Sequence, residues 1–410
     1  MSVSVQLLRR IDELTGLAPR WRELAGDVPF RAPEWLLPWW DTYGEPHPGE
    51  RATRELFAVA VFAEEGTDAE SEPGAATPPT AKKLVALAPW YVEPSPLWGR
   101  VVRQLGSGEV CSDYQTVLVE PDCAAEAIAA IADFLTREVR NDWDRLELDG
   151  AVCDDEALGA LTAELARRGS PVERRRGPSC WRVKLPTTFA EYLTNLSKSH
   201  RKQLRRLQRD VLATDRAVWH TARTMDEFEV GWEIFVDLHQ RRRRSLGDGG
   251  RFESPCFMGF HREVARSLHS DRKLRLHWLE LDGRPAAAEY HFSAGNTVFG
   301  YQSGLDPERL HEEPGRLAGI CVVEALIEEG FEFYDLLRGD EPYKAHWRAE
   351  PTATEQVTVV NPRKRSRARH AVHTLLRRIK RCFAKGEPAG SRPVAAAEAA
   401  EDVEVAAAGN

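Results

Sequence analysis

The sequence predicts a mixed α/β protein of two tandem domains, each with a central mixed sheet flanked by helices. Three observations predict this fold class: a repeat between the two halves, the same order of strands and helices in each half, and an ordinary globular composition. The chain has 410 residues, of which 42% are hydrophobic and 29% are charged. A chain of this composition folds, and its length exceeds that of one typical domain.

The composition also excludes several classes of protein. No run of about 18 apolar residues occurs, so we expect no membrane-spanning helix. The N-terminus lacks a basic start before a long apolar core, and we expect no secretory signal. The seven cysteines form no CxxC pair, which favours a reduced, cytoplasmic chain without disulfides and without a metal site. The net charge of −8 disfavours nucleic-acid binding over the whole surface.

Segments of the first half match segments of the second half in the same order. The matches pair residues 10–14 with 224–228, 30–36 with 252–258, 84–91 with 274–292, and 124–150 with 316–339. Each match is weak alone, but their shared order favours duplication of one unit.

The first copy, which we place at residues 1–165, is expected to be degenerate as a catalyst. Residues 55–62 and 84–92 are rich in strand-forming residues and predict a hairpin. The low-complexity segment 64–83 between them lengthens its loop, which costs little free energy. Further on, a helix over 124–139 leads into a strand over 144–150, which indicates a strand–helix–strand crossover.

The second copy is placed at residues 181–360. Its first part, 181–211, predicts a strand followed by one long basic helix. Thr188 with Glu191 has the spacing of a capping box at the start of this helix. A hairpin over 274–292 turns at Asp282-Gly283, and a helix over 316–330 leads into the strand 333–339.

The C-terminal part divides into two segments. Residues 361–385 carry ten Lys or Arg residues and no acid, with apolar residues at helical spacing, which predicts a basic amphipathic helix. Three interpretations stay open for it: peripheral contact with an anionic membrane, packing on the domain, or partial disorder. Residues 386–410 are rich in Ala, Glu and Pro, and we expect them to be disordered.

Three strings carry a resemblance to a known family: Leu196-Ser-Lys-Ser-His-Arg-Lys202, Ser112-Asp-Tyr114, and Phe333-Tyr-Asp-Leu-Leu-Arg-Gly-Asp-Glu-Pro-Tyr-Lys-Ala-His-Trp347. Over about residues 5–360 the chain resembles the tandem form of the GNAT acyltransferase superfamily. Within it, the chain resembles the acetyltransferases linked to cellulose and other exopolysaccharide synthesis (CelD/BcsL type), relatives of the Fem-type transferases. The resemblance implies two GNAT-like domains and transfer of an acetyl or acyl group from acyl-CoA to an amine or hydroxyl of a sugar or cell-envelope precursor.

The resemblance also implies a donor site. GNAT folds bind the pyrophosphate of acyl-CoA at a helix N-terminus, with an Arg/Gln-x-x-Gly-x-Gly/Ala pattern. Arg316-x-x-Gly319-x-Cys321 is a near match, with Cys at the last position. We therefore expect acetyl-CoA, or another acyl-CoA, to bind at Gly315, Arg316, Leu317, Ala318 and Gly319. The alternative is a plain turn into a helix, because Pro-Gly is also an ordinary helix start.

Candidate catalytic residues lie on the strand 287–292. Strand alternation puts Glu289 and His291 on one face and Tyr290 on the other. The first two residues are candidates for a general base and a proton shuttle. The alternative is a solvent-facing polar stripe on an edge strand.

The last string of the resemblance supplies three further candidates. Asp335 either orients the acceptor or pairs with Arg338 or Lys344, since a carboxylate among apolar neighbours needs a partner. The resemblance places Lys344 at the acyl-transfer site, where it would neutralise oxyanion charge or hold a phosphate, and Tyr343 beside it. The first copy lacks this Tyr-Lys pair, so we expect the active site in the second copy.

The basic and histidine side chains, and the overall function, leave several alternatives open. The basic run 198–209 is either a solvated face or a funnel for an anionic ligand. His200 and His239 are interpreted as helix-surface residues. One rival function is a Fem-like aminoacyl-tRNA-dependent transferase, although residues 217–360 leave no room for the long coiled-coil arm common in that group. Another is a non-catalytic scaffold subunit of a polysaccharide synthesis machine. The expected partner is a small-molecule or saccharide acceptor, with tRNA only as the alternative donor.

Overall fold

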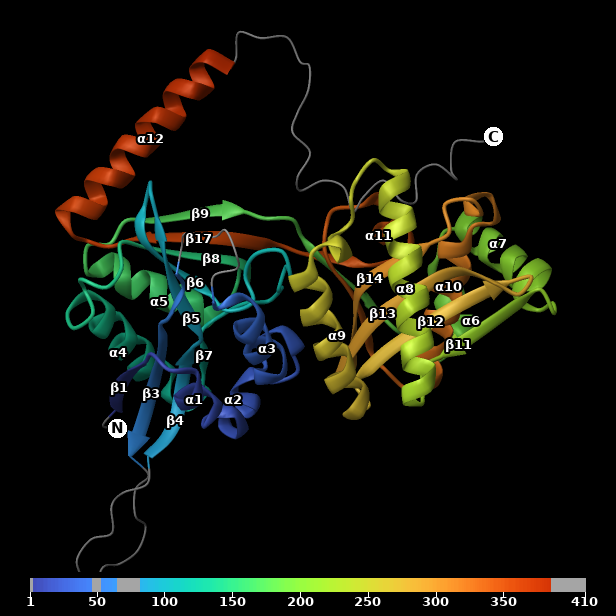
Figure 1. The fold of residues 1–410 in the computed structure, drawn as a ribbon, viewed down its shortest axis with the longest axis horizontal. Coiled ribbons are helices and arrows are strands. Elements are labelled where there is room, and N and C mark those ends of the chain that lie inside the picture. The colour runs from blue at the N-terminus through green and yellow to red at the C-terminus, as the bar shows by residue number, and fades with distance from the viewer. Residues whose placement is uncertain (1–2, 46–52, 65–81, 385–410) are drawn as a thin grey trace, which may run out of the picture. The chain divides into compact units, whose positions relative to one another are not determined.

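The computed structural model describes residues 3–45, 53–64 and 82–384 and divides into two units (Figure 1). Among the described residues, one unit contains the chain up to Gly177 and again from Thr354, and the other contains Pro178–Ala353. The expected second domain, 181–360, therefore differs from the structure at its end. The last strand, β17 (Thr354–Val360), pairs with strands of the first unit, where Val357 and Val359 are buried in the core.

The first unit has a four-stranded sheet of order β1-β3-β4-β7 and a six-stranded sheet of order β2-β5-β6-β8-β17-β9. Its strands besides β17 are β1 (Val3–Leu8), β2 (Glu55–Leu56), β3 (Ala58–Glu64), β4 (Lys82–Ala88), β5 (Trp90–Ser95), β6 (Gly99–Gln104), β7 (Leu118–Val119), β8 (Arg145–Val152) and β9 (Val172–Arg176). Its helices are α1 (Ile11–Thr15), α2 (Ala18–Ala25), α3 (Pro33–Tyr43), α4 (Ala124–Thr136), α5 (Glu156–Arg167) and α12 (Lys364–Ala384). The expected hairpin is formed by β3 and β4; most of its long loop, residues 65–81, lies outside the described residues.

The second unit has one seven-stranded sheet of order β11-β12-β13-β14-β15-β10-β16. Its strands are β10 (Cys180–Lys184), β11 (Ala217–Thr221), β12 (Leu274–Leu281), β13 (Arg284–Ala294), β14 (Thr297–Leu305), β15 (Phe333–Arg338) and β16 (Glu350–Thr352). Its helices are α6 (Phe189–Asn195), α7 (Lys198–Leu207), α8 (Met225–Ser245), α9 (Pro255–Ser270), α10 (Pro314–Glu328) and α11 (Pro342–His346). The predicted mixed α/β fold class is confirmed in both units.

One pair of strands in the second unit opens along its length. β14 and β15 are parallel and pair only from Thr297 to Phe299 on β14 and from Phe333 to Asp335 on β15. Beyond these residues the two strands no longer pair with each other: β14 still pairs with β13, and Arg338 of β15 pairs with Cys180 of β10. The two strands therefore diverge toward their carboxyl ends. α10 connects them as a crossover helix. The first unit repeats this arrangement with the parallel strands β6 and β8 and the helix α4.

The two faces of the second sheet carry different helices. On one face, the Tyr290 ring of β13 lies 5.4 Å from Trp232 and 5.2 Å from Phe235 of α8. A methyl group added at Gly304 of β14 would lie 2.6 Å from the backbone nitrogen of His239, so the glycine allows α8 to pack directly on the sheet. The other face packs against α6, α7 and α10, whose apolar residues share one core with the sheet.

Local sequence signals explain several element boundaries. Asp282 and Gly283 have φ angles of 51° and 72°, as a two-residue hairpin turn requires. Thr188 caps α6 by accepting a hydrogen bond from the Glu191 amide at 3.2 Å. The prediction of one long basic helix is wrong, because Leu196 is extended and Ser197 caps a new helix, α7.

The basic C-terminal helix is anchored at its start. The buried Asp144 of the first unit lies 2.6 Å from Ser366 Oγ and 2.9 Å from an Arg363 nitrogen. The first turn of α12 therefore packs on the domain, as one of the three interpretations expects. The segment 386–410 lies outside the described residues. Within the described chain, no helix is long and apolar enough to cross a membrane.

Candidate active site

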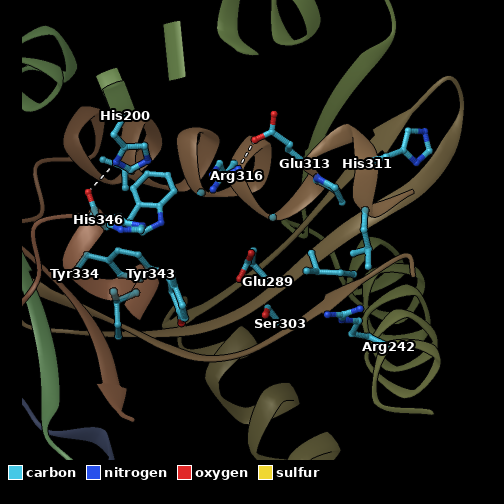
Figure 2. A pocket seen from close by; sticks show the side chains of 18 residues that line it. His200, Arg242, Glu289, Ser303, His311, Glu313, Arg316, Tyr334, Tyr343 and His346 are labelled. Carbon is cyan, nitrogen blue, oxygen red and sulfur yellow. Dashed lines mark hydrogen bonds and ion pairs between the residues drawn. The ribbon is translucent and has the colours of Figure 1, made fainter. Parts of the chain in front are cut away.

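A cavity of about 450 Å³ lies in the second unit, on the face of the sheet that packs against α10 (Figure 2). Its walls come from β13, β14 and β15, at the point where the last two strands diverge, and from α7, α8, α10 and α11. A volume of this size is typical of sites for small ligands.

A row of polar residues crosses the sheet beside this cavity. Thr221, His277, Glu289 and Ser303 are direct cross-strand partners on the four consecutive strands β11 to β14, and the last two line the cavity. Thr221 Oγ1 lies 2.9 Å from His277 Nδ1. Burial lowers the pKa of His277 to about 3, so its ring is neutral near pH 7. The row gives the cavity a polar floor within an apolar sheet.

The predicted pair Glu289 and His291 is brought together. His291 Nε2 lies 3.0 Å from Glu289 Oε2, and the two side chains are 2% and 12% exposed, respectively. His291 Nδ1 has no hydrogen-bond partner among the described residues. Because a carboxylate oxygen accepts, Nε2 carries the proton and fixes the orientation of Glu289. The alternative of a solvent-facing stripe is wrong, since β13 is a central strand.

Strand alternation separates Tyr334 from Asp335. Tyr334 lines the cavity, its hydroxyl lies 3.4 Å from His291 Nε2, and burial raises its pKa well above the usual value. Asp335 is fully buried and accepts hydrogen bonds from Arg182 Nε at 3.0 Å and from the Leu337 amide at 2.9 Å. Of the expected partners, Arg338 or Lys344, the lysine pairs with Glu341, and Arg182 of β10 supplies a cation to Asp335.

Lys344 is placed away from the cavity. Its ammonium group donates to the carbonyl oxygens of Leu337, Arg338 and Gly339 at 3.0–3.1 Å, and it lies 2.8 Å from Glu341 Oε2. The residue is 2% exposed and does not line the cavity. Its contacts differ from those expected at an acyl-transfer site, because its ammonium group makes its hydrogen bonds to the backbone of the turn after β15. Its neighbour Tyr343 does line the cavity.

The expected donor segment is split between cavity and core. Gly315, Arg316 and Gly319 line the cavity, whereas Leu317 and Ala318 are fully buried in the core. A methyl group at Gly319 would lie 2.6 Å from the Trp347 ring, so this glycine makes room for a tryptophan.

Glu313 occupies the start of α10. Its carboxylate lies 2.5 Å from a nitrogen of Gln203 and 2.5 Å from one of Arg206, and it also pairs with Arg316. Its carbonyl oxygen accepts from the amides of Arg316 and Leu317. The helix N-terminus therefore presents a carboxylate and few free amides. An expected pyrophosphate site would instead present free amides to the anion.

Two histidines were predicted to lie on helix surfaces; this is wrong for His239, whereas His200 is partly exposed on α7. His239 of α8 is 4% exposed, and burial lowers its pKa to about 4. His200 of α7 lines the cavity, and its Nδ1 lies 2.8 Å from the carbonyl oxygen of His346. The spacing of His200 with Leu204 and Leu207, which are buried, places all three on the inner face of α7. This spacing is visible in the sequence.

The charged residues of the described chain form no metal site: no cluster of three or more His, Cys, Asp or Glu side chains there is arranged to hold an ion. Cys321 of α10 does not supply a reactive thiolate, because burial raises its pKa to about 12.

Comparison with known proteins connects this site to one family. Residues 198–345 match the family model described as "Acetyltransferase (GNAT) domain". No curated protein matches the chain significantly. The resemblance to GNAT proteins is therefore supported for the part of the chain that builds the cavity, while the narrower resemblance to exopolysaccharide-linked acetyltransferases stays a prediction.

Several solved structures resemble the chain at low identity. The crystal structure of FemX is 10% identical, has a TM-score of 0.57 and covers 87% of this chain and 97% of its own. A protein of unknown function from Bacteroides thetaiotaomicron is 8% identical, with a TM-score of 0.47 and coverage of 87% and 100%. A tandem GNAT protein from the clavulanic acid biosynthesis pathway is 13% identical, with a TM-score of 0.44 and coverage of 88% and 99%. At such identities the FemX likeness concerns the fold alone.

Proposed function

We propose that the second unit transfers an acyl group from acyl-CoA to an amine or hydroxyl acceptor held in its cavity. The observation that carries this proposal is the Glu289 carboxylate, oriented by His291 on the floor of a cavity of about 450 Å³. The match of residues 198–345 to an acetyltransferase domain supports acyl chemistry there.

The arrangement supports a direct transfer without an acyl-enzyme. Glu289 accepts a hydrogen bond, and then the proton, from the acceptor N–H or O–H. The acceptor nitrogen or oxygen forms a bond to the thioester carbonyl carbon, the C–S bond breaks, and the leaving thiolate takes a proton from solvent, to which Glu289 later returns the acceptor proton. Tyr334 stays protonated because its pKa is raised, so its hydroxyl is available as a hydrogen-bond donor to developing negative charge.

The class of acceptor rests on the sequence resemblance. We propose a sugar or a precursor of an exopolysaccharide or of the cell envelope. The polar floor supports a hydroxyl-rich ligand, because Glu289 and Ser303 both present oxygen atoms to the cavity. Each of these oxygens accepts a hydrogen bond, and the serine hydroxyl also donates one.

Measuring thiol release from acetyl-CoA over a panel of amino sugars tests the proposal. The Glu289→Gln variant keeps the size of the side chain and is expected to lose about 100-fold or more in kcat/KM, with an unchanged thermal unfolding midpoint. Glu280→Gln on β12 is the matched control, because Glu280 pairs with His220 outside the cavity and should leave turnover unchanged. Full activity of the Glu289 variant contradicts the proposed role of this carboxylate.

A second candidate donor, aminoacyl-tRNA, is favoured by one surface. Lys198, Lys202 and Arg205 lie exposed on α7, and within the described chain they form no ion pair. Against this donor, α8 and α9 pack on the sheet and do not form a projecting arm. Measuring tRNA binding against salt concentration decides between the two donors, because a tRNA donor requires an affinity that falls steeply with salt.

A further inference from the structure

Exposed apolar side chains gather on and beside α12. Among the side chains that the structure describes, the three most exposed large apolar ones are Leu97 at 63% and Val372 and Leu375 at 58% each. The last two belong to α12, and Leu97 lies in the turn between β5 and β6. This turn is next to α12, because the ring centroids of Trp98 and His373 are 4.0 Å apart. Apolar side chains gathered in this way mark a surface that binds a partner.

The face by which α12 packs on the first unit is polar. Ser366 Oγ lies 2.6 Å from one oxygen of the Asp144 carboxylate, and an Arg369 nitrogen lies 3.3 Å from the other oxygen. One residue further on, His370 Nε2 lies 2.9 Å from Glu173 Oε1. Hydrogen bonds and ion pairs therefore hold the start of this helix on the domain.

The apolar residues lie on the opposite face of α12. At 3.6 residues per turn, Ala368, Val372 and Leu375 share one face of the helix, and Ser366 and His370 lie roughly opposite. The first three residues are exposed, whereas Ser366 is buried and His370 is half-buried. An amphipathic helix normally packs its apolar stripe on the core. In α12 the polar side faces the domain, and the apolar side is left for a partner outside it.

The charge that accompanies this apolar face is positive. Residues 361–385 carry ten Lys or Arg residues and no acid. Lys364, Arg365 and Arg367 are exposed, and none of them forms an ion pair with the part of the chain that the structure describes. In the sequence, apolar residues keep their helical spacing up to Phe383. An apolar stripe accompanied by unpaired cations fits the surface of an anionic membrane.

We infer that α12 binds the first unit to a membrane surface that contains anionic lipid. Leu97, Val372 and Leu375 enter the boundary between headgroups and acyl chains, where they leave water. The unpaired cations lie at the lipid phosphates, where the negative surface potential attracts them. This inference goes beyond the proposed acyl transfer and does not depend on it.

Two other partners fit the surface less well. A nucleic acid would pair with the cations but would leave the apolar side chains in water. A second copy of the chain would cover the apolar side chains but would bring two helices of the same charge together, which is unfavourable. An anionic membrane satisfies both the apolar side chains and the cations.

Cosedimentation of the full chain with lipid vesicles tests the inference. Vesicles of phosphatidylcholine alone are compared with vesicles in which about one-third of the lipid is phosphatidylglycerol. The chain should bind the anionic vesicles, and its affinity should fall as salt is added, because salt screens the surface potential. Its affinity for the neutral vesicles should be about 10-fold lower or less.

The double variant Val372→Ser and Leu375→Ser removes apolar contacts and keeps every charge. Its affinity for the anionic vesicles is expected to fall about 10-fold or more. Its thermal unfolding midpoint should not change, because both side chains are exposed. Met225→Ser with Val230→Ser on α8 is the matched control, since these side chains are 44% and 53% exposed in the second unit. The control should bind the vesicles like the wild type.

A second double variant, Arg365→Gln with Arg367→Gln, tests the charge. It should lower the affinity for the anionic vesicles about 10-fold and weaken its dependence on salt. Losses in both the serine and the glutamine variants support a membrane surface. Wild-type affinity in the serine variant overturns the inference, because charge alone would then attract the vesicles.

Two further outcomes also overturn the inference. One is failure of the full chain to bind anionic vesicles at low salt, whether or not it binds an oligonucleotide. The other is self-association through this face instead, which sedimentation would show as a dimer that the serine variant dissociates.

Discussion

Lys344 shows how burial decides the role of a side chain that the sequence presents as catalytic. The resemblance placed this lysine at the transfer site. In the structure its three hydrogens are taken by three carbonyl groups of one turn, and its charge is paired with Glu341. The turn needs this cation, because Leu337 and Gly339 have positive φ angles of 55° and 126°, which point their carbonyls to a common centre.

Replacing Lys344 with Met should therefore lower stability. Removing one partner of a buried ion pair leaves Glu341 and the turn carbonyls without compensation, at a cost of about 3–5 kcal/mol in the free energy of unfolding. Urea denaturation measures this cost. In the Glu341→Gln background the same change should cost less, since the two residues are coupled. A variant that keeps full stability and loses turnover would return Lys344 to the catalytic residues.

At the residue scale, the periodicity of the sequence predicted which side chains share a face of a strand, but it could not predict their partners on other strands. The period of two along β13 was enough to place Glu289 and His291 together. The same period on β15 separates Tyr334 from Asp335, although the prediction selected only the aspartate. The partner of Asp335 could not be predicted, because Arg182 lies 153 residues away and is brought close only by the pairing of β10 with β15.

At the scale of elements, the sheet and its helices bury histidines that stay neutral. Burial lowers the pKa of His239 on α8 to about 4 and of His277 on β12 to about 3, and it holds the pKa of His261 on α9 well below the usual value. These rings are neutral in the folded state near pH 7. In the unfolded chain they would bind protons with an ordinary pKa of about 6.5.

The free energy of unfolding should therefore fall as the pH drops below about 6.5. The unfolded state binds more protons than the folded state in the range between about pH 6.5 and 4, so acid favours unfolding. Each of the three histidines should contribute about 1 kcal/mol of loss between pH 7.5 and 5.5. Urea denaturation at the two pH values checks this. A flat profile would mean that these rings are hydrated in the folded state.

The start of α10 gives a second prediction at this scale. Glu313→Gln removes a negative charge from the helix N-terminus while keeping a side chain that can bond to Arg206 and Arg316. Desulfo-CoA should bind several-fold more tightly to this variant, since an anion at a helix N-terminus gains from the helix dipole. Weaker binding would contradict this and would show that the carboxylate organises the two arginines for the ligand.

Capping signals show how far elements can be predicted from sequence. Thr188 and Glu191 located the start of α6 correctly. The end of that helix was missed because the basic run 198–209 continues with good helix formers. Ser197 is a strong capping residue and is the signal that divides α6 from α7. That division sets the position of α7, whose His200 lines the cavity.

At the scale of the whole molecule, the repeat predicted two units of like topology but not their boundary. A repeat orders segments along the chain, whereas a strand selects its neighbours in space. β17 follows the second copy in sequence and is inserted between β8 and β9 of the first unit. A strand–helix–strand crossover was predicted, and each unit contains one between two parallel strands. The cavity could not be predicted, since it depends on α7 and α11, which are distant in sequence and meet at the carbonyl of His346.

Because β17 belongs to the sheet of the first unit, the stability of that unit should depend on residues near the end of the chain. A chain ending at residue 353 lacks β17, which leaves β8 and β9 without a shared neighbour and removes Val357 and Val359 from the core. The loss of two fully buried valines alone costs about 3–6 kcal/mol of hydrophobic stabilisation, comparable to the total stability of many domains. Hydrogen exchange should show a protected first unit in a chain ending at residue 384 and little protection there in a chain ending at 353. Residues 178–353 should remain protected in both chains. Equal protection of the first unit in the two chains would show that it does not need β17.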